Sequence, residues 1–349
     1  MFNKKVLKKD TQQQRYMAVI GLGILLLISV LVSFQLGRYP ISAKEVFGIL
    51  ISKFIPLEKF WTDRIESVFI YIRLPRVLLA CLVGCCLSAA GAAYQGVFQN
   101  PMASPDILGA SAGAAFGAAL AILNYASSAV ITVSAFSFSF ITVAIVYLIG
   151  KKTTEKAVIG LILAGIMVGS LFSAGTSFIK LVADPNDQLP AITYWLMGKL
   201  SGAKLSDISF AIVPMVIGLI PLFLIRWHLN ILTLGDDEAK TMGVNPQLTR
   251  FIVIVSATFV TAASVSVSGV IGWVGLVIPH LARKLVGNNY KWLMPACMLL
   301  GANFLLIVDN FARNLFTTEI PIGILTSFIG SLFFIYLFAR KGRASEDSR

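Results

Sequence analysis

Uncharged apolar runs of about 20 residues recur from one end of the chain to the other, and they constrain its fold more than any other feature. A soluble domain could not bury so much apolar surface, because 57% of the residues are hydrophobic and only 13% are charged. Hydrocarbon offers the backbone no hydrogen-bond partner, so a membrane-crossing segment must be a helix or part of a closed barrel. Barrel strands are about ten residues long and alternate in polarity. The sequence therefore predicts an all-α, polytopic membrane protein.

Ten runs are candidates for membrane-spanning helices. They cover residues 17–36, 76–98, 106–123, 127–149, 157–181, 208–227, 249–268, 274–286, 292–312 and 321–339. The stretch 249–286 is too long for one span of roughly 20 residues, and the glycines within 269–275, followed by Pro279, offer a tight break that divides it. We expect a single transmembrane domain over residues 1–349 with ten helices, the first of them uncleaved.

The distribution of Lys and Arg predicts which side each terminus faces. Ten spans place both termini on one side, and both termini are basic, so the positive-inside rule puts them in the cytoplasm. The short loops obey this rule, whereas the outer stretch 37–76 holds seven Lys and Arg residues. Because the basic residues lie between apolar runs, we assign the net charge of +12 to orientation and membrane lipid, and expect no nucleic-acid partner.

Small residues recur at helical spacing within the apolar runs. Glycines four residues apart let membrane helices approach closely, which predicts helix packing at Gly109, Gly113, Gly117, Gly165 and Gly169. The four cysteines, Cys81, Cys85, Cys86 and Cys297, also lie in apolar runs, where small core residues are expected. Their spacing matches neither a disulfide framework nor a zinc site, and we expect no metal site.

Two other classes of protein, an ion-coupled carrier and an intramembrane hydrolase, fit the sequence less well. An ion-coupled carrier usually has ionisable groups inside its spans, and the span interiors here are nearly bare of charge. "GASAG" at 109–113 matches the nucleophile motif of hydrolases, with Ser111 as nucleophile and His280 as its distant partner, but the motif lies in an Ala/Gly-rich membrane helix. No glycine-rich loop ending in Gly-Lys-Ser/Thr occurs, so the chain should not hydrolyse ATP itself. We expect no catalytic residue and no cofactor in this chain.

The segment 228–248 is the most polar inner loop. "GDDEAKTMGVN" within it has the pattern of a short helix, with acidic residues at the start and a glycine at the end. Ala239, Met242 and Val244 give this helix a small apolar face. Two interpretations remain open, a solvated loop helix and a docking helix for a cytoplasmic partner.

Several long motifs, in one order along the chain, resemble a known family. They are "RLPRVLLACLVGCCLSAAGAAYQGVFQNPMASPDILGASAGA" at 73–114, "YWLMGKLSG" at 194–202, "LGDDEAKTMGVN" at 234–245, "SGVIGWVGLVIPHLAR" at 268–283 and "EIPIGILTSFIGSLFFIYL" at 319–337. The chain resembles the permease subunits of binding-protein-dependent ABC importers for iron-siderophores, haem and vitamin B12, the FecCD-type, type II group. The ten-helix fold of that group agrees with the count above.

The resemblance implies the partners and the task. Such a permease pairs with a second permease, identical or paralogous, in the bacterial cytoplasmic membrane. Two ATPase subunits lie beneath the pair and bind ATP, and an extracellular or periplasmic binding protein delivers the metal complex. An iron(III)-siderophore is the expected substrate, and haem or cobalamin are the alternatives.

The resemblance also implies roles for individual residues. Binding-protein docking is implied for Arg73, Arg76 and Arg313; ATPase coupling for Asp236, Asp237, Glu238, Ala239, Gly243 and Val244; and contact with the transport pathway for Ser170, Ser173 and Thr176, on the helix expected over 157–181. The tenth span is also expected near the pathway.

The two arginines of "RLPR" have competing explanations. Pro75 suits the first turn of a helix, which would put Arg76 at the positive end of the helix dipole, where a cation is mildly unfavourable. Snorkelling to lipid phosphates is one alternative to docking for Arg73 and Arg76. For Arg313 the alternative is an exposed i, i+4 pair with Asp309, which would be weak.

Overall fold

The computed structural model describes the backbone of residues 2–53, 55–152 and 157–346, and the side chains of 12–53, 55–152, 158–337 and 339. Within these ranges the chain forms helices and no strand. The α-helices are α1 (Phe2–Gln35), α2 (Ala43–Ser52), α3 (Asp63–Val68), α4 (Leu74–Val97), α5 (Ala110–Leu123), α6 (Ser128–Lys151), α7 (Ala157–Val182), α8 (Gln188–Leu196), α9 (Leu205–Leu224), α10 (Arg226–Leu232), α11 (Asp236–Thr241), α12 (Pro246–Ser268), α13 (Val274–Val286), α14 (Tyr290–Asn314) and α15 (Ile322–Glu346). A π-turn (Phe69–Arg73) precedes α4, and a 3-10 turn (Pro105–Leu108) precedes α5.

Each of the ten predicted runs corresponds to a helix. The run 274–286 coincides with α13, and most other boundaries differ by a few residues, but α1 begins fifteen residues before its run and α15 ends seven residues after its run. Among the described residues, seven helical segments are long and apolar enough to cross a membrane, while α5 and the described part of α15, Ile322–Leu337, are shorter apolar helices. The all-α, polytopic fold class is confirmed, and the count of ten spans stays a prediction.

The second span differs from the prediction because it begins much earlier. Asp63–Val97 is one continuous helical segment of 35 residues, in which the π-turn joins α3 to α4. Such local π-geometry accommodates a proline inside a membrane helix, so Pro75 does not mark a helix start. Arg76 lies in about the fourth turn of the segment. The expected repulsion from the positive end of a helix dipole therefore does not apply to it.

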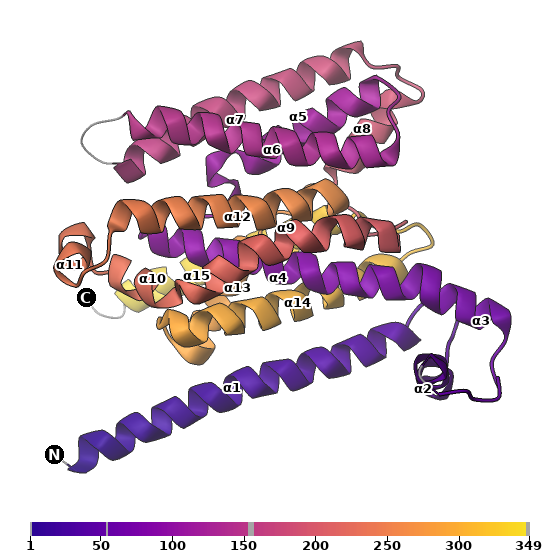
Figure 1. Ribbon diagram of the computed structural model, residues 1–349, viewed down its shortest axis with the longest axis horizontal. Coiled ribbons are helices and arrows are strands. Elements are labelled where there is room, and N and C mark those ends of the chain that lie inside the picture. The colour runs from indigo at the N-terminus through magenta and orange to yellow at the C-terminus, as the bar shows by residue number, and fades with distance from the viewer. Residues whose placement is uncertain (1, 54, 153–156, 347–349) are drawn as a thin grey trace.

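Helix α4 is the centre of the fold and lies between α12 and α14 in Figure 1. Its backbone touches two neighbours directly. A Cβ at Gly84 would overlap the carbonyl of Gly301 on α14, and a Cβ at Gly91 would overlap the carbonyl of Gly275 on α13. Glycine at these positions allows the closest packing of helices in a membrane.

A second layer, made of α5, α6, α7 and α8, lies beside α12 (Figure 1). Added methyl groups would overlap Thr142 and Phe138 at Gly113, Ser134 at Gly117, and the carbonyl of Ile107 at Gly165. Gly109 has φ +74°, and its Cα lies against Gly169. The glycines singled out in the sequence therefore lie where α5 meets α6 and where α7 meets the turn before α5.

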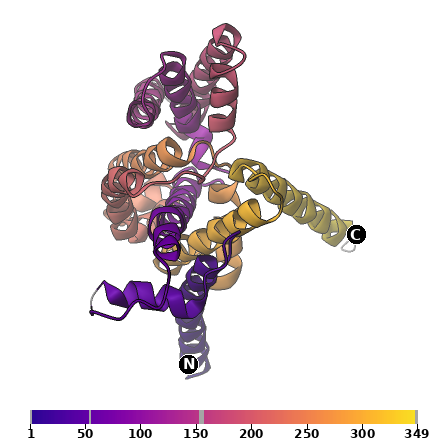
Figure 2. The same ribbon diagram turned by 90° about the vertical axis from the view of Figure 1, so that its right-hand side faces the viewer.

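The two ends of the molecule are chemically different. Both termini lie at the same end as α11, and α2 and α3 lie at the opposite end (Figure 1). We call these the α11 end and the α3 end. Helix α15 projects away from the other helices (Figure 2). Large apolar side chains along it are exposed, among them Phe328 and Ile335 at 64% each.

Candidate functional site

The arginines of "RLPR" belong to a buried ionic cluster at the α3 end. Arg76 is 7% exposed, and its Nε donates to both carboxylate oxygens of Asp309, at 2.9 and 3.1 Å. Its Nη1 donates to both oxygens of Glu319, at 3.0 and 2.9 Å. Asp309 is fully buried, whereas the Glu319 side chain is 31% exposed. We call Arg73, Arg76, Asp309, Arg313 and Glu319 the arginine cluster.

The two other arginines connect this cluster to the end of α1. Arg313, 6% exposed, donates to the carbonyl of Ser33 at 3.0 Å and lies 3.8 Å from Asp309. Arg73, 3% exposed, donates to the carbonyls of Phe34 and Tyr39. The cluster therefore fastens α1, α4, α14 and the loop before α15 to one another.

These contacts change what was expected of the three arginines. The pair between Arg313 and Asp309 forms as the spacing predicts, but the expectation that it is exposed is wrong, since both side chains are almost fully buried. The guanidinium groups of Arg73 and Arg76 are bonded to this chain rather than open to lipid phosphates. Their part in docking a binding protein stays a prediction.

The segment predicted as a docking helix forms α11 at the opposite end. Gly235 at φ +133° precedes it and Gly243 at φ +79° follows it, conformations that favour glycine. Ala239 and Val244 are buried against Ile231 of α10. Asp236 accepts hydrogen bonds from both Nη atoms of Arg250 on α12, one of them at 2.8 Å. This ion pair fixes α11 to a long helix of the bundle.

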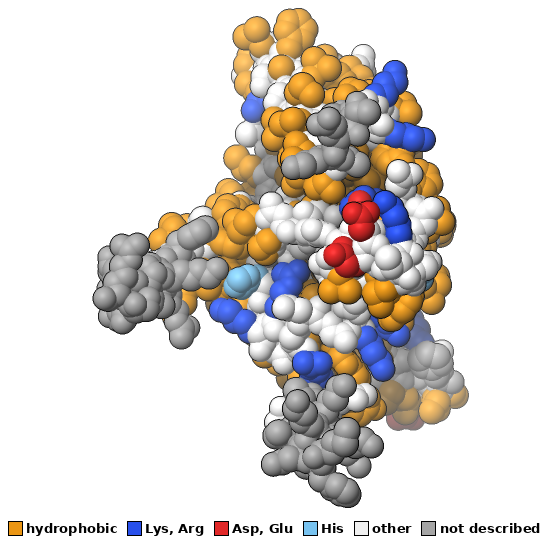
Figure 3. Space-filling view, turned by 90° about the vertical axis from the view of Figure 1, so that its left-hand side faces the viewer, with side chains coloured by type: hydrophobic (Ala, Val, Ile, Leu, Met, Phe, Trp, Pro, Cys, Tyr) orange, Lys and Arg blue, Asp and Glu red, His pale blue; other side chains and the backbone are white. Residues whose placement is uncertain are grey.

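The outer side of α11 is open and carries mixed chemistry. The Asp237 carboxylate is 93% exposed and pairs with Lys240 at 3.1 Å. Leu234 and Met242, at either end of the helix, are 61% and 51% exposed. Met242 therefore does not share the buried face of Ala239 and Val244. Figure 3 shows acidic and basic side chains together on the α11 end of the molecule. A cavity of about 560 Å³ lies beside α11, between it and the start of α12.

Helix α7 presents the polar residues predicted for the pathway on different sides. Ser170 and Ser173 are exposed, whereas Thr176 is 7% exposed and its hydroxyl donates to the carbonyl of Phe172. Ser177 is also exposed, and its hydroxyl donates to the carbonyl of Ser173 at 3.0 Å. Ser177 was not among the residues predicted for the pathway, although its spacing of four residues from Ser173 places both on one face.

A groove runs between the end of α8, the break before α13 and the start of α15. It encloses about 640 Å³ and is lined by Leu196, Met197, Val270, Gly272, Trp273, Gly323, Ile324, Ser327, Phe328 and Ser331. Trp273 has φ +71°, a conformation uncommon outside glycine, and packs against Gly330. None of the lining residues is charged.

Backbone hydrogen bonds join the three segments around this groove. Gly323 N–H donates to the Met197 carbonyl at 3.1 Å, and Ile322 N–H donates to the Gly198 carbonyl at 2.9 Å. Lys199 N–H donates to the carbonyl of Ser268 on α12 at 2.7 Å. The end of α12 that is remote from α11 is therefore bonded directly to the loop that borders the groove.

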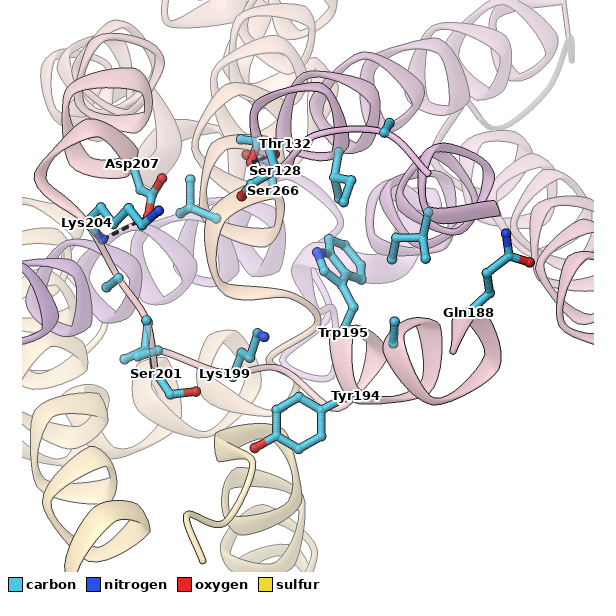
Figure 4. Close-up of a pocket in the computed structure, with 18 of the residues that line it drawn as sticks. Ser128, Thr132, Gln188, Tyr194, Trp195, Lys199, Ser201, Lys204, Asp207 and Ser266 are labelled. Atoms are coloured by element: carbon cyan, nitrogen blue, oxygen red, sulfur yellow. Dashed lines mark hydrogen bonds between the residues drawn. The ribbon is translucent and has the colours of Figure 1, made fainter. Parts of the chain in front are cut away.

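A second cavity, of about 580 Å³, lies on the other side of α8. Figure 4 shows Trp195 and Lys199 pointing into a space that Ser128 and Ser266 border from the opposite side. The Lys199 ammonium lies 5.1 Å from the ring centre of Tyr194. These residues belong to the motif "YWLMGKLSG", to which the sequence analysis gave no site role.

The residues of the hydrolase interpretation do not form its catalytic pair. The Ser111 hydroxyl donates to the carboxylate of Asp106 rather than to a histidine. His280 packs edge-on against Phe333, with ring centres 6.0 Å apart. Among the described residues, no group of three His, Cys, Asp or Glu side chains could hold a metal ion, and the four cysteines carry free thiols.

Comparisons with known proteins agree over nearly the whole chain. Residues 25–340 match the model of the FecCD transport family. A molybdate import system permease protein of Haemophilus influenzae is 40% identical over 328 residues, which cover 93% of this chain and 96% of the relative. A probable iron chelatin transport system permease protein of Helicobacter pylori is 40% identical over 276 residues, 79% of this chain and 83% of the relative.

One solved structure has the same fold. It is an inward-facing metal-chelate type ABC transporter, 37% identical in sequence, and its chain superposes with a TM-score of 0.82. The match covers 92% of this chain and 98% of that one.

Proposed function

The chain belongs to the FecCD transport family, and we propose that its substrate is a metal complex of the iron(III)-siderophore class. It is a multi-pass membrane protein, the permease subunit of an ABC importer. The ATPase of such an importer is a separate subunit. Haem- and cobalamin-type complexes remain the alternatives on the same fold.

The observation that supports a bulky organic complex is the chemistry of α7 and of the groove beside α15. The lining of the groove has no charged side chain, and two of the exposed α7 hydroxyls already donate within the helix, Ser170 to the Ile166 carbonyl and Ser177 to the Ser173 carbonyl. A bare oxyanion gives up its hydration only to strong donors. A metal wrapped in an organic ligand needs no such donors.

Molybdate is the second candidate, because the relative aligned over 93% of this chain is named for its import. The cavity drawn in Figure 4 is lined by Lys199 and Lys204 together with hydroxyl side chains, but also by Asp187 and Asp207, so its lining carries both signs of charge.

Uptake into proteoliposomes separates the two candidates. The permease is reconstituted with its ATPase and binding protein, and ATP-dependent accumulation of iron-55 chelate and of molybdate is measured in parallel. Saturable uptake of the chelate without uptake of molybdate is the expected result. Molybdate uptake alone would reject the chelate proposal, and uptake without ATP would reject the ABC mechanism.

We propose that the α11 end faces the bacterial cytoplasm and receives the ATPase. Asp237, Glu238 and Gly243 lie on or beside α11, and the exposed Leu234 and Met242 supply apolar contact area next to them. Both termini lie at the same end and would therefore be cytoplasmic. The second permease would cover α7 and α15, whose exposed apolar side chains have no partner helix within the described part of this chain.

We propose that the α3 end receives the binding protein. Its arginines are not free docking contacts, because they are already bonded within this chain. Because Arg76 already holds two carboxylates, a carboxylate from a partner reaches it only if Glu319 moves away. Replacing Arg73 and Arg76 by Glu would disrupt the buried cluster, so loss of docking in that variant would not isolate the contact. Glu319→Lys tests docking better: it removes the carboxylate that competes for Arg76 and adds a cation, so we expect increased affinity for the binding protein in a folded permease, and unchanged affinity would reject this docking site.

A further inference from the structure

An apolar slot lies between α6 and α12, away from the groove beside α15. Its volume is about 240 Å³, and it is lined by Phe140, Val143, Ala144, Tyr147, Leu148, Phe251, Ile254, Val255 and Thr258. The Thr258 hydroxyl donates to the carbonyl of Ile254 at 2.7 Å, so it offers no donor to an occupant. An apolar cavity of this kind does not hold ordered water.

Aromatic pairs lie near both ends of the slot. Tyr147 and Phe251 have ring centres 5.4 Å apart toward the α11 end, and Phe140 and Phe259 have ring centres 4.6 Å apart toward the other end. Between them, the short side chain of Ala144 leaves the space open. The slot is therefore elongated along the helices, which is the shape that a hydrocarbon chain requires.

The mouth of the slot faces lipid. Both helices are candidate membrane spans, and the rim residues Leu148 and Phe251 are 63% and 43% exposed. An acyl chain of the bilayer is therefore the molecule available to fill it.

Two cations lie where the headgroup of such a lipid would be. Lys151 follows Tyr147 by four residues and Ala144 by seven, so it lies on the same face of α6 and about 10 Å further along the axis. Lys151 and Lys152 are both exposed, and no carboxylate pairs with either within the described residues. Cations at this depth attract anionic headgroups of the cytoplasmic leaflet.

We propose that this slot is a binding site for an anionic phospholipid, with one acyl chain between α6 and α12 and the phosphate at Lys151 and Lys152. The bound lipid fastens the layer of α5–α8 to α12. Helix α12 carries Arg250, the partner of Asp236, at one end and is bonded to the groove loop at the other. Occupancy of the slot would therefore influence how the two layers move during transport.

Native mass spectrometry of the full-length chain in mild detergent tests the site. With phosphatidylglycerol and phosphatidylcholine of matched chains, we expect one tightly retained lipid and a preference for the anionic one. Ala144→Phe fills the slot and should lower retention roughly tenfold. Ile145→Phe, on the lipid-facing side of the same turn, is the control and should retain the lipid. Equal retention in both variants would overturn the proposal.

The lysines and an unmodified chain supply independent readouts. Lys151→Gln and Lys152→Gln should each reduce the anionic preference about fivefold, whereas Lys291→Gln, exposed at the same end on α14, should not. In the unmodified chain, a phospholipid with a photoreactive acyl chain should crosslink within 140–148 and 251–258, and phosphatidylglycerol should compete. Crosslinks outside these two segments would overturn the proposal, and so would crosslinks showing that a second copy of the chain fills the slot. Both results come from the unmodified chain, so they hold even if Ala144→Phe fails to fold.

Discussion

The arginine cluster at the α3 end and the α11 segment at the opposite end are both motif-rich regions that the sequence marks for partner contact, yet their chemistry differs. Arg73, Arg76 and Arg313 are buried and bonded to segments that are far apart in the sequence. The charged residues of α11 pair with residues only three to fourteen positions away in the sequence, and the Asp237 carboxylate is almost fully exposed.

This difference separates two reasons for a charge near the end of a membrane span. At the α3 end the charges hold the chain's own segments together, and a partner gains access only at the margin, through Glu319. At the α11 end the fold is secured by apolar contacts of Ala239 and Val244 and by one ion pair, so the remaining charges are free to meet a partner. Substitutions in the arginine cluster should therefore lower stability more than partner binding. Substitutions on the outer side of α11 should lower partner binding more than stability.

The largest effect is expected from Arg76→Ala. It leaves Asp309, which is fully buried, with only Arg313 at 3.8 Å, and it removes the partner of Glu319. Breaking a buried ion pair from one side costs about 3–5 kcal/mol. We expect a large fall in the thermal denaturation midpoint in detergent and a low yield of folded protein.

A double variant and a matched control make this measurement specific. Arg76→Met with Asp309→Leu removes both charges and should recover part of the lost stability, because the fully buried Asp309 carboxylate no longer lacks its main partner; Arg313 loses only the longer pair at 3.8 Å and keeps its bond to the Ser33 carbonyl. Lys240→Ala, which breaks the exposed pair with Asp237, should change stability by less than about 1 kcal/mol. If Arg76→Ala denatured at the same temperature as the unchanged protein, the cluster would have no structural role.

The sequence predicts the helices of the bundle well where local signals are strong. The run 274–286 coincides with α13, because glycines precede it and Gly287 at φ +79° ends it. The prediction fails before Pro75, where charged residues of α3 hide a helix that is continuous with α4. A span predicted from hydropathy stops at such charged residues. The helix itself continues as long as its backbone hydrogen bonds are formed.

The arginine cluster could not be predicted from local sequence for a different reason. Arg76 and Asp309 are 233 residues apart, and a charge whose partner is so distant resembles a surface charge. The α11 pattern was informative because its cap glycine, acidic first turn and buried Ala239 all lie within one short stretch. The contacts of Gly84 with Gly301 and of Gly91 with Gly275 were missed for the same reason as the cluster.

Arg250→Ala should have the next largest effect and should move partner binding as well as stability. The Asp236 side chain is 43% exposed, so water can replace the lost hydrogen bonds, and we expect a stability loss of about 1–2 kcal/mol. The α11 helix would lose its connection to α12. ATPase binding, measured by titration of the purified subunit, and transport-coupled ATP hydrolysis should both fall. If Arg250→Ala weakened the packing of α11 but left transport-coupled ATP hydrolysis at the wild-type level, the proposed ATPase contact at α11 would be contradicted.

Glu319→Gln should have a smaller effect on stability than either arginine variant. The Glu319 side chain is 31% exposed, and solvent screens its pairing with Arg76, so we expect a loss of about 0.5–1 kcal/mol. If Arg76 receives a carboxylate of the binding protein, the loss of this competing carboxylate should raise the affinity of docking. Unchanged docking affinity with the expected stability loss would assign the cluster to the fold alone.

The smallest effect on stability is expected at the exposed apolar residues that flank α11. Leu234 and Met242 are 61% and 51% exposed, so Leu234→Ser with Met242→Ser should change the free energy of unfolding by less than about 0.5 kcal/mol for each residue. The same change removes apolar area from the proposed ATPase contact and should weaken ATPase binding about tenfold, with docking at the α3 end unchanged. Ile212→Ser on α9 is the control, since Ile212 is 40% exposed but lies away from α11. At the α11 end, a variant would then weaken partner binding without lowering stability. At Arg76 no variant can do so, because the same buried groups hold the fold together and would meet the partner.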